Sequence, residues 1–139
     1  MSEEPQRIET VLAVDSDEEN LCLMKSILGL KGFDVLQAVN GREAVDLAFR
    51  WRPELILMDL KLPIVSGFTV VRRIKKHESL RNIPIISFAI VEQTCYRELA
   101  LAEGCAAFLD KPLDFDELDS LIDQFLPGHS LELTSVLVH

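Results

Sequence analysis

The stretch Glu54-Leu-Ile-Leu-Met-Asp59-Leu-Lys-Leu-Pro63 decides the fold of this chain. Its four consecutive apolar residues, 55–58, follow a proline and end at an acid. This run is too short for an independent helix and is typical of a central strand buried on both faces. Ligands bind at the carboxyl ends of the strands in open α/β sheets, so Asp59 is a candidate site residue. Taken alone, the stretch fits equally well with Asp59 capping the loop that Pro63 and Gly67 shape.

The composition predicts one globular domain. The chain has 139 residues, 48% of them hydrophobic and 27% charged, which is enough to bury a core. Its net charge of −9 argues against a nucleic-acid surface, and the cluster 72–76 fits the solvated face of a helix. The N-terminus is polar and no apolar run approaches the ~20 residues that span a bilayer, so we expect a cytoplasmic protein without membrane contact.

The rest of the chain alternates predicted strands and helices. Further strands are expected over 10–14, 33–39, 83–88 and 106–109. The first helix is expected to run from the cap Asp17 to Gly32, and the second from the capping box 40–43 to a stop at Pro53. A third helix is expected to begin at Gly67, and a fourth to cover about 92–103. The fifth is expected to run from the capping box 114–117 to residue 125. Trp51 is assigned to an inward face, and Cys22, Cys95 and Cys105 to small buried positions in a reducing compartment.

This alternation predicts an α/β fold, namely a doubly wound, five-stranded parallel sheet of flavodoxin-like (βα)5 type with strand order 2-1-3-4-5. The domain is expected over 9–126, after a flexible lead, 1–8. The tail 127–139 has too little polar surface for a linker. An added strand, a partner-binding segment and a truncation remnant all stay open for it.

Polar residues follow three of the predicted strands, at Asp15, at Asp59 and at Asp110-Lys111-Pro112. We expect these three strands to be central neighbours, so that two carboxylates and an ammonium converge at one edge of the sheet. Two nearby carboxylates repel each other and attract a divalent cation, and Mg²⁺ is held by a few carboxylates together with waters. A lysine beside them can hold a phosphoryl oxygen. The convergence therefore predicts a site that moves a phosphoryl group onto or off an aspartate.

Together, Val14-Asp15, the stretch 58–63 with Gly67, and Asp110-Lys111-Pro112 resemble the motifs of bacterial response-regulator receiver domains of the chemotaxis-regulator type. The similarity covers about residues 9–126. It implies that Asp59 accepts a phosphoryl group from a histidine kinase or phosphotransfer protein and that Lys111 contacts that group. It also implies that Asp15 and the backbone carbonyl of Lys61 help to hold Mg²⁺, that the peptide before Pro112 is cis, and that the chain is a signalling protein and not an enzyme.

Two positions depart from the pattern of that family, and a third change, to a residue that the family tolerates, fits with them. Ser16 stands where a second acid is usual, which predicts weak Mg²⁺ binding. Ala89 stands where a Ser or Thr hydroxyl normally binds the phosphoryl group, and Ser87 is expected to lie too deep to replace it. The switch position on the fifth strand, often Tyr, is Phe108. These changes predict that the phosphorylation switch is weakened or absent.

Two other functions stay open. The chain could be a pseudo-receiver whose resting shape already binds its partner without phosphorylation. Asp15-Ser-Asp17 also matches the bare element of haloacid-dehalogenase-type phosphohydrolases, but the other parts of that class are missing. By resemblance, a downstream protein docks on the face of the fourth helix, fifth strand and fifth helix, where we expect Arg97, Glu98, Asp116, Asp119 and Asp123 to be exposed. A homodimer stays open as well.

Overall fold

The computed structural model describes residues 8–90 and 95–128, which form five strands and five helices in alternation. The five strands form one parallel sheet in the order β2-β1-β3-β4-β5, so the predicted fold class is confirmed. The elements are β1 (Thr10–Val14), α1 (Glu18–Leu30), β2 (Asp34–Ala38), α2 (Gly41–Trp51), β3 (Leu55–Asp59), α3 (Gly67–Lys76), β4 (Ile85–Ile90), α4 (Tyr96–Ala102), β5 (Ala107–Lys111) and α5 (Phe115–Phe125).

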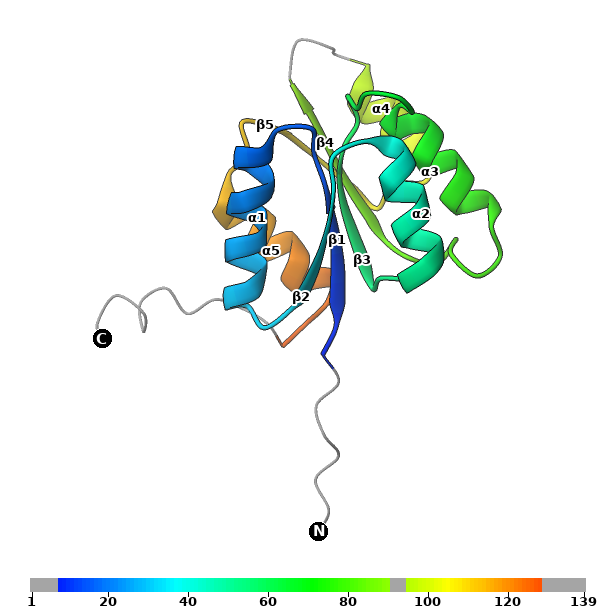
Figure 1. Cartoon of the computed structure of the whole chain (residues 1–139). Helices are drawn as coiled ribbons and strands as arrows, with labels where there is room; N and C mark the ends of the chain where they lie inside the picture. The colour runs from blue at the N-terminus through cyan, green and yellow to red at the C-terminus, as the bar shows by residue number, and fades with distance from the viewer. Residues whose placement is uncertain (1–7, 91–94, 129–139) are drawn as a thin grey trace, which may run out of the picture.

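The sheet separates two hydrophobic layers. Helices α1 and α5 cover one face, and α2, α3 and α4 cover the other (Figure 1). Each layer has its own core, because successive side chains of a strand point to opposite faces. In β3, for example, Ile56 and Met58 belong to the core under α2 and α3, whereas Leu55 and Leu57 belong to the core under α1 and α5. The central stretch is therefore buried on both faces, as its composition predicts.

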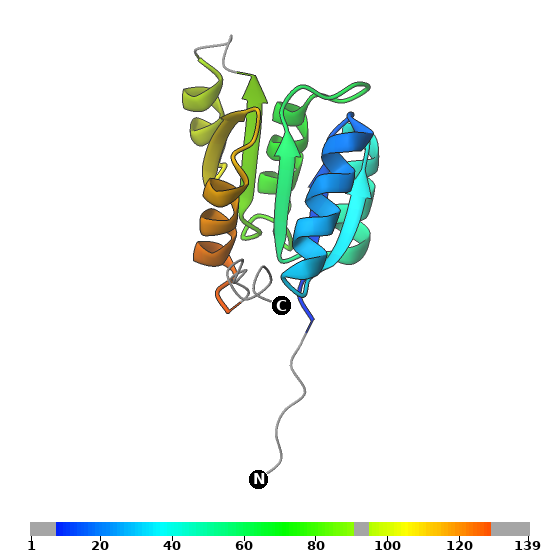
Figure 2. The ribbon, with the colours of Figure 1, turned by 90° about the vertical axis from the view of Figure 1, so that its left-hand side faces the viewer.

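The strands all end at one edge of the sheet (Figure 2). Val14 pairs with Met58 across β1 and β3, Asp59 pairs with Phe88 across β3 and β4, and Ile90 pairs with Lys111 across β4 and β5. This register brings the polar residues at the ends of β1, β3 and β5 to the same edge.

Side-chain caps start four of the five helices, which explains why their beginnings could be predicted. The caps of α1, α2, α3 and α5 are Asp17, Asn40, Ser66 and Asp114, and each accepts a hydrogen bond from a backbone N–H in the first turn. No side chain caps α4 at Cys95. Within the described residues, every helix is too short or too polar to cross a membrane.

Several predicted element boundaries were wrong. Strand β4 ends at Ile90 and not at residue 88, and β5 continues to Lys111, because the two strands stay paired as far as Ile90 and Lys111. Strand β2 is one residue shorter at each end than predicted. Helix α4 begins at Tyr96 and not near 92; residues 92–94 of that prediction lie outside the described residues, as do most of the lead and the tail.

Some predicted burials were also wrong. Trp51, the last residue of α2, is 59% exposed. Cys22 and Cys95 are exposed, whereas Cys105 is buried. Asp119 forms an ion pair with Lys31 at the end of α1, so it faces away from α4.

Asp123, one turn after Asp119, is half-buried. The side of α5 that faces α4 instead presents Glu117, Ser120 and Gln124, because residues three and four positions apart share one face of a helix. Arg97, Glu98 and Asp116 are exposed as expected, whereas Asp119 and Asp123 are half-buried and do not belong to the expected patch.

Candidate functional site

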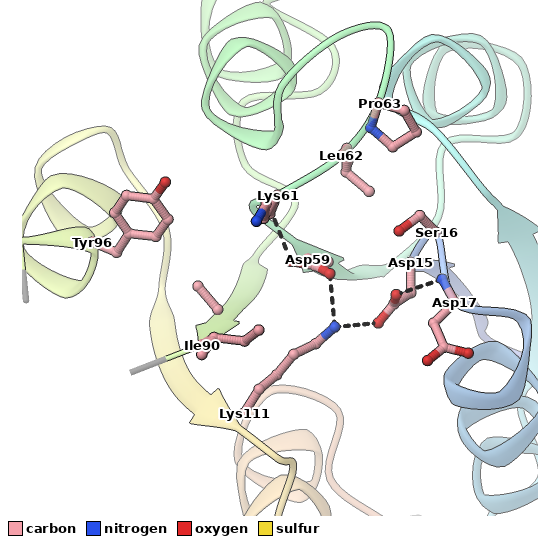
Figure 3. A pocket seen from close by; sticks show the side chains of 11 residues that line it. Asp15, Ser16, Asp17, Asp59, Lys61, Leu62, Pro63, Ile90, Tyr96 and Lys111 are labelled. Atoms are coloured by element: carbon pink, nitrogen blue, oxygen red, sulfur yellow. Dashed lines mark hydrogen bonds and ion pairs between the residues drawn. The ribbon is translucent and has the colours of Figure 1, made fainter. Parts of the chain in front are cut away.

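A cleft of about 630 Å³ opens at the edge of the sheet where the strands end. Asp15 directly follows β1, Asp59 is the last residue of β3 and Lys111 is the last residue of β5, and all three line the cleft (Figure 3). Both carboxylates are buried, with Asp15 fully enclosed and Asp59 only 5% exposed. The structure therefore brings together the three residues on which the sequence-based site depends.

The ammonium of Lys111 lies between the two carboxylates. Its Nζ is 2.9 Å from Asp15 Oδ2 and 2.7 Å from Asp59 Oδ2 (Figure 3). The expectation that the three strands are central neighbours was wrong, because β5 is an edge strand and β4 lies between β3 and β5. The length of the lysine side chain overcomes this separation, and its Nζ lies 5.4 Å from the ring centroid of Phe88 on β4.

Further backbone and side-chain donors bind the same two carboxylates. The N–H of Asp17 donates to Asp15 Oδ1 and the N–H of Lys61 donates to Asp59 Oδ1, each at 2.9 Å. Asn20 donates from Nδ2 to Asp15 Oδ2 at 3.2 Å. Sequence reasoning missed Asn20; the signal was a polar residue in the first turn of α1, on the helix that leaves the site.

Burial sets the proton affinity of Asp59. Burial raises the pKa of its carboxyl above the ordinary value of 3.8, against the lowering influence of Lys111 and of the Lys61 N–H. Burial acts on Lys111 in the opposite sense, but its hydrogen bonds and charge interactions with Asp59 and Asp15 outweigh that effect and raise the pKa of Lys111. The lysine therefore stays charged and compensates the two buried acids.

Two glycines let α2 and α3 approach closely the loop that follows Asp59. Gly67 begins α3 directly against the loop that follows Asp59, and a Cβ at this position would lie 2.5 Å from Leu60 Cα. Gly41 begins α2 against the same loop, where a Cβ would lie 2.0 Å from the carbonyl oxygen of Val65. Both helices therefore approach this loop at a distance that only glycine allows. The peptide between Lys111 and Pro112 is cis.

The departures from the expected pattern lie in the cleft as well. Ser16 and Ala89 both line it. Asp17 cannot replace the missing acid in this arrangement, since its carboxylate accepts the N–H of Glu19 and caps α1. Asp17 is thus the N-cap of α1, as predicted. Ser87 is fully buried and its hydroxyl donates to the carbonyl of Ala107, so it does not reach the cleft.

Phe108 is buried on β5 under Arg97 of α4. The Arg97 guanidinium lies 5.1 Å from the ring centroid, and it also contacts the Phe108 carbonyl and the Asp110 carboxylate at 3.5 Å each. One side chain therefore connects α4 to three groups of β5. The phenyl ring has no hydroxyl that could move between two hydrogen-bond partners.

The donor set of the cleft fits Mg²⁺, with less charge than three acids would supply. Among residues 8–90 and 95–128, no group of three or more His, Cys, Asp or Glu side chains is arranged to hold a metal. The cleft does offer the carboxylates of Asp15 and Asp59 and the hydroxyl of Ser16, and Mg²⁺ is commonly bound through one or two carboxylates and waters. Any bound cation would share both carboxylates with Lys111.

Known proteins with similar sequences belong to one signalling family. The family model described as response regulator receiver domain matches residues 11–123. The chain is 34% identical over 117 residues to the polar-differentiation response regulator DivK of Brucella anthropi, which covers 84% of this chain and 95% of that protein. The corresponding protein of Brucella ovis is 33% identical with the same coverage.

Solved structures agree. The receiver domain of the sensor histidine kinase PA1611 from Pseudomonas aeruginosa, which has magnesium coordinated in its active site cleft, superposes with a TM-score of 0.79 at 29% identity, covering 88% of this chain and 100% of that one. The receiver domain of a histidine kinase from Syntrophus aciditrophicus gives a TM-score of 0.79 at 30% identity, with 86% and 91% covered. With the sheet order, the buried acid pair and its lysine, these similarities lead to one conclusion: the chain belongs to the response-regulator receiver domains of two-component signalling.

Proposed function

We propose that Asp59 is the phosphoryl acceptor of this receiver domain and that the donor is the phosphohistidine of a histidine kinase or phosphotransfer protein. The observation that carries the proposal is the position of the Asp59 carboxylate, buried in a cleft and bound to the ammonium of Lys111 at 2.7 Å. The ammonium faces the space into which a phosphoryl group would enter. Lys111 can therefore follow the negative charge from the carboxylate to the phosphoryl oxygens during transfer.

Each remaining polar group has a defined task in this proposal. The N–H of Lys61 holds Asp59 Oδ1, which leaves Oδ2 as the attacking oxygen once Lys111 moves to the phosphoryl group. Asn20 and the N–H of Asp17 hold Asp15 in place. Mg²⁺ would be held by Asp15, Asp59, the backbone carbonyl of Lys61 and the Ser16 hydroxyl, and it supplies positive charge to the phosphoryl oxygens.

Weak Mg²⁺ binding and a weak switch follow from two side chains of this cleft. A hydroxyl at Ser16 carries no charge, so the cation loses one ionic partner. Ala89 offers no donor to the phosphoryl group, and a charge-assisted hydrogen bond contributes ~1.5–3 kcal/mol. Because coupling between two sites typically amounts to ~1–3 kcal/mol, the loss of this bond can remove all of it.

A second candidate function is a pseudo-receiver that binds its partner without phosphorylation. The contacts of Arg97 with Phe108 and Asp110 favour it, because they hold α4 on β5 while Asp59 carries no phosphoryl group. Beside them, a groove of about 380 Å³ between α4, β5 and α5 contains Leu101, Phe108 and Leu121, with Glu117 and Gln124 at its rim. We assign this groove to the downstream partner in both candidate functions.

Intact-mass analysis tests the acceptor role. The protein is incubated with Mg²⁺ and a small phosphodonor, and a single phosphoryl adduct is expected in the wild type and absent in Asp59→Asn. Asp17→Asn is the matched control, since Asp17 lines the same cleft but caps α1, and it should label normally. Equal labelling of wild type and Asp59→Asn would refute the acceptor role. A wild type that never labels but still binds a partner at the groove would favour the pseudo-receiver.

A further inference from the structure

The cleft around Asp59 has an apolar side that the proposed phosphoryl transfer does not use. Tyr96 and Ile90 line it together with the small side chain of Ala89, while Leu62 and Pro63 lie across the cleft, near Ser16 (Figure 3). Figure 3 shows the ring of Tyr96 on the side of the cleft opposite Asp15 and Ser16, with Asp59 and Lys61 between them. A cleft of about 630 Å³ with one apolar side and a few converging charges has the size and lining of a site for a small organic anion.

The ring of Tyr96 is held in place and only half-buried. It packs edge-to-face against Phe68 of α3, with ring centroids 5.3 Å apart. Tyr96 is the first residue of α4, and Ala89 is the last residue but one of β4; both line the cleft. Because alanine is small, position 89 leaves more of the cleft beside Tyr96 open than a larger side chain would.

We propose that Tyr96 makes this cleft select phosphodonors whose phosphoryl group is attached to a flat aromatic ring, such as an N-phosphorylated imidazole, over donors without a ring. The inference rests on the proposed acceptor role of Asp59 and adds the specificity of the same site. Without a hydroxyl at position 89, the phosphoryl group alone has fewer partners, so contacts with the rest of the donor matter more. A protonated imidazole ring would also gain from lying against an aromatic face.

The transfer itself is balanced without a further reactant. Oδ2 of Asp59 forms a bond to phosphorus while the phosphorus–nitrogen bond breaks. Its electron pair stays on the ring nitrogen, so a ring already protonated on its other nitrogen leaves as neutral imidazole. Tyr96 takes no part in these bonds. It binds the ring of the donor in the ground state and in the transition state alike, which changes the apparent KM and leaves kcat unchanged.

Two donors with the same reacting bond test the selection. Phosphoimidazole and phosphoramidate both transfer through a phosphorus–nitrogen bond, but only the first carries a ring. The rate of Asp59 labelling at low donor concentration is measured by intact mass for the wild type, Tyr96→Phe and Tyr96→Ala. We expect Tyr96→Ala to lose roughly threefold to tenfold with phosphoimidazole, the size of one aromatic contact, and to be unchanged with phosphoramidate. Tyr96→Phe should behave as the wild type.

A matched control separates this effect from damage to α4. Leu99 lies on the same helix, is 46% exposed and does not line the cleft, so Leu99→Ala should leave both rates unchanged. Far-UV circular dichroism and urea unfolding of each variant check that it is folded. If Tyr96→Ala slows both donors equally, or slows neither, the proposal is refuted.

Binding of unreactive probes distinguishes failure of this inference from failure of the acceptor role. The affinities of phenylphosphonate and methylphosphonate are measured by NMR titration without metal. The wild type should prefer the phenyl compound, and Tyr96→Ala should lose that preference. If Asp59 never labels but the preference depends on Tyr96, the acceptor role fails and the ring site stands. If Asp59 labels but neither the donor pair nor the phosphonate pair depends on Tyr96, the acceptor role stands and the ring site fails.

Discussion

Replacing Lys111 with methionine should destabilise the protein by about 3–5 kcal/mol at neutral pH, because it leaves two buried carboxylates without their shared cation. The lysine side chain is only 14% exposed, and its Nζ lies 2.9 Å and 2.7 Å from the two acids. Methionine keeps most of the apolar stem that crosses Phe88, so the change removes mainly the charge.

Electrostatics between the two acids gives a similar magnitude. The two Lys111 distances place Asp15 Oδ2 and Asp59 Oδ2 at most about 5–6 Å apart, where two like charges repel by about 3 kcal/mol at an effective dielectric constant of ~20. The variant should relieve this repulsion by taking up a proton at Asp59. The double variant Lys111→Met/Asp59→Asn should therefore recover much of the lost stability.

The pH dependence follows from the same group. The pKa of Asp59 is already raised in the folded protein, so its contribution to stability is present below its ordinary value of 3.8 and is lost as the pH rises through the folded pKa. Lys111 lowers the pKa of Asp59, so removing the lysine raises that pKa further. The stability contributed by Asp59 is then lost over a range that extends to higher pH. The difference in unfolding free energy between wild type and Lys111→Met should thus be largest at neutral pH and shrink at acidic pH, as the pH falls toward the ordinary pKa of 3.8.

Urea unfolding followed by far-UV circular dichroism measures these differences. The matched control is Lys61→Met, a lysine of the same cleft that is exposed, which should change stability by no more than about 0.5 kcal/mol. If Lys111→Met is as stable as Lys61→Met, or is destabilised equally at neutral and acidic pH, the electrostatic account of the site is wrong.

Three further changes test other parts of the structure. Gly67→Ala should lower the free energy of unfolding in urea by about 1–3 kcal/mol, since its Cβ would lie 2.5–2.8 Å from backbone atoms of Asp59 and Leu60. Gly29→Ala in α1, whose Cβ would have nothing within 4 Å, should raise it by up to about 1 kcal/mol. Equal effects of the two variants would contradict the close approach of α3. Ser16→Asp should bind Mg²⁺ roughly tenfold more tightly in isothermal titration calorimetry, because a carboxylate near the cation adds about 1–4 kcal/mol of attraction. Ser16→Thr, which adds no charge, should bind as the wild type does. An unchanged affinity of Ser16→Asp would show that position 16 does not contact the ion. Asn20→Ala should cost about 1–2 kcal/mol of stability through its lost bond to Asp15, and no loss would mean that this bond is replaced by water.

The sequence alone determined the fold class and most of the elements of this protein. Short apolar runs ending in acids mark β1 and β3, and the caps Asp17, Asn40 and Asp114 mark the starts of helices, because both signals depend on residues that are close together in the chain. Strict alternation then implies a parallel sheet, whose strands all end at one edge. That rule was enough to predict that Asp15, Asp59 and Lys111 share a site.

Only the tertiary structure decided how these residues meet. The lysine contacts acids that are 96 and 52 residues away in the chain, and it does so by reaching past β4, which no local pattern contains. The same holds for Asn20 against Asp15, for Tyr96 in the cleft and for the exposure of Trp51. Local periodicity sets which face of an element is apolar; the packing of distant elements sets which polar groups touch and which side chains stay exposed to solvent.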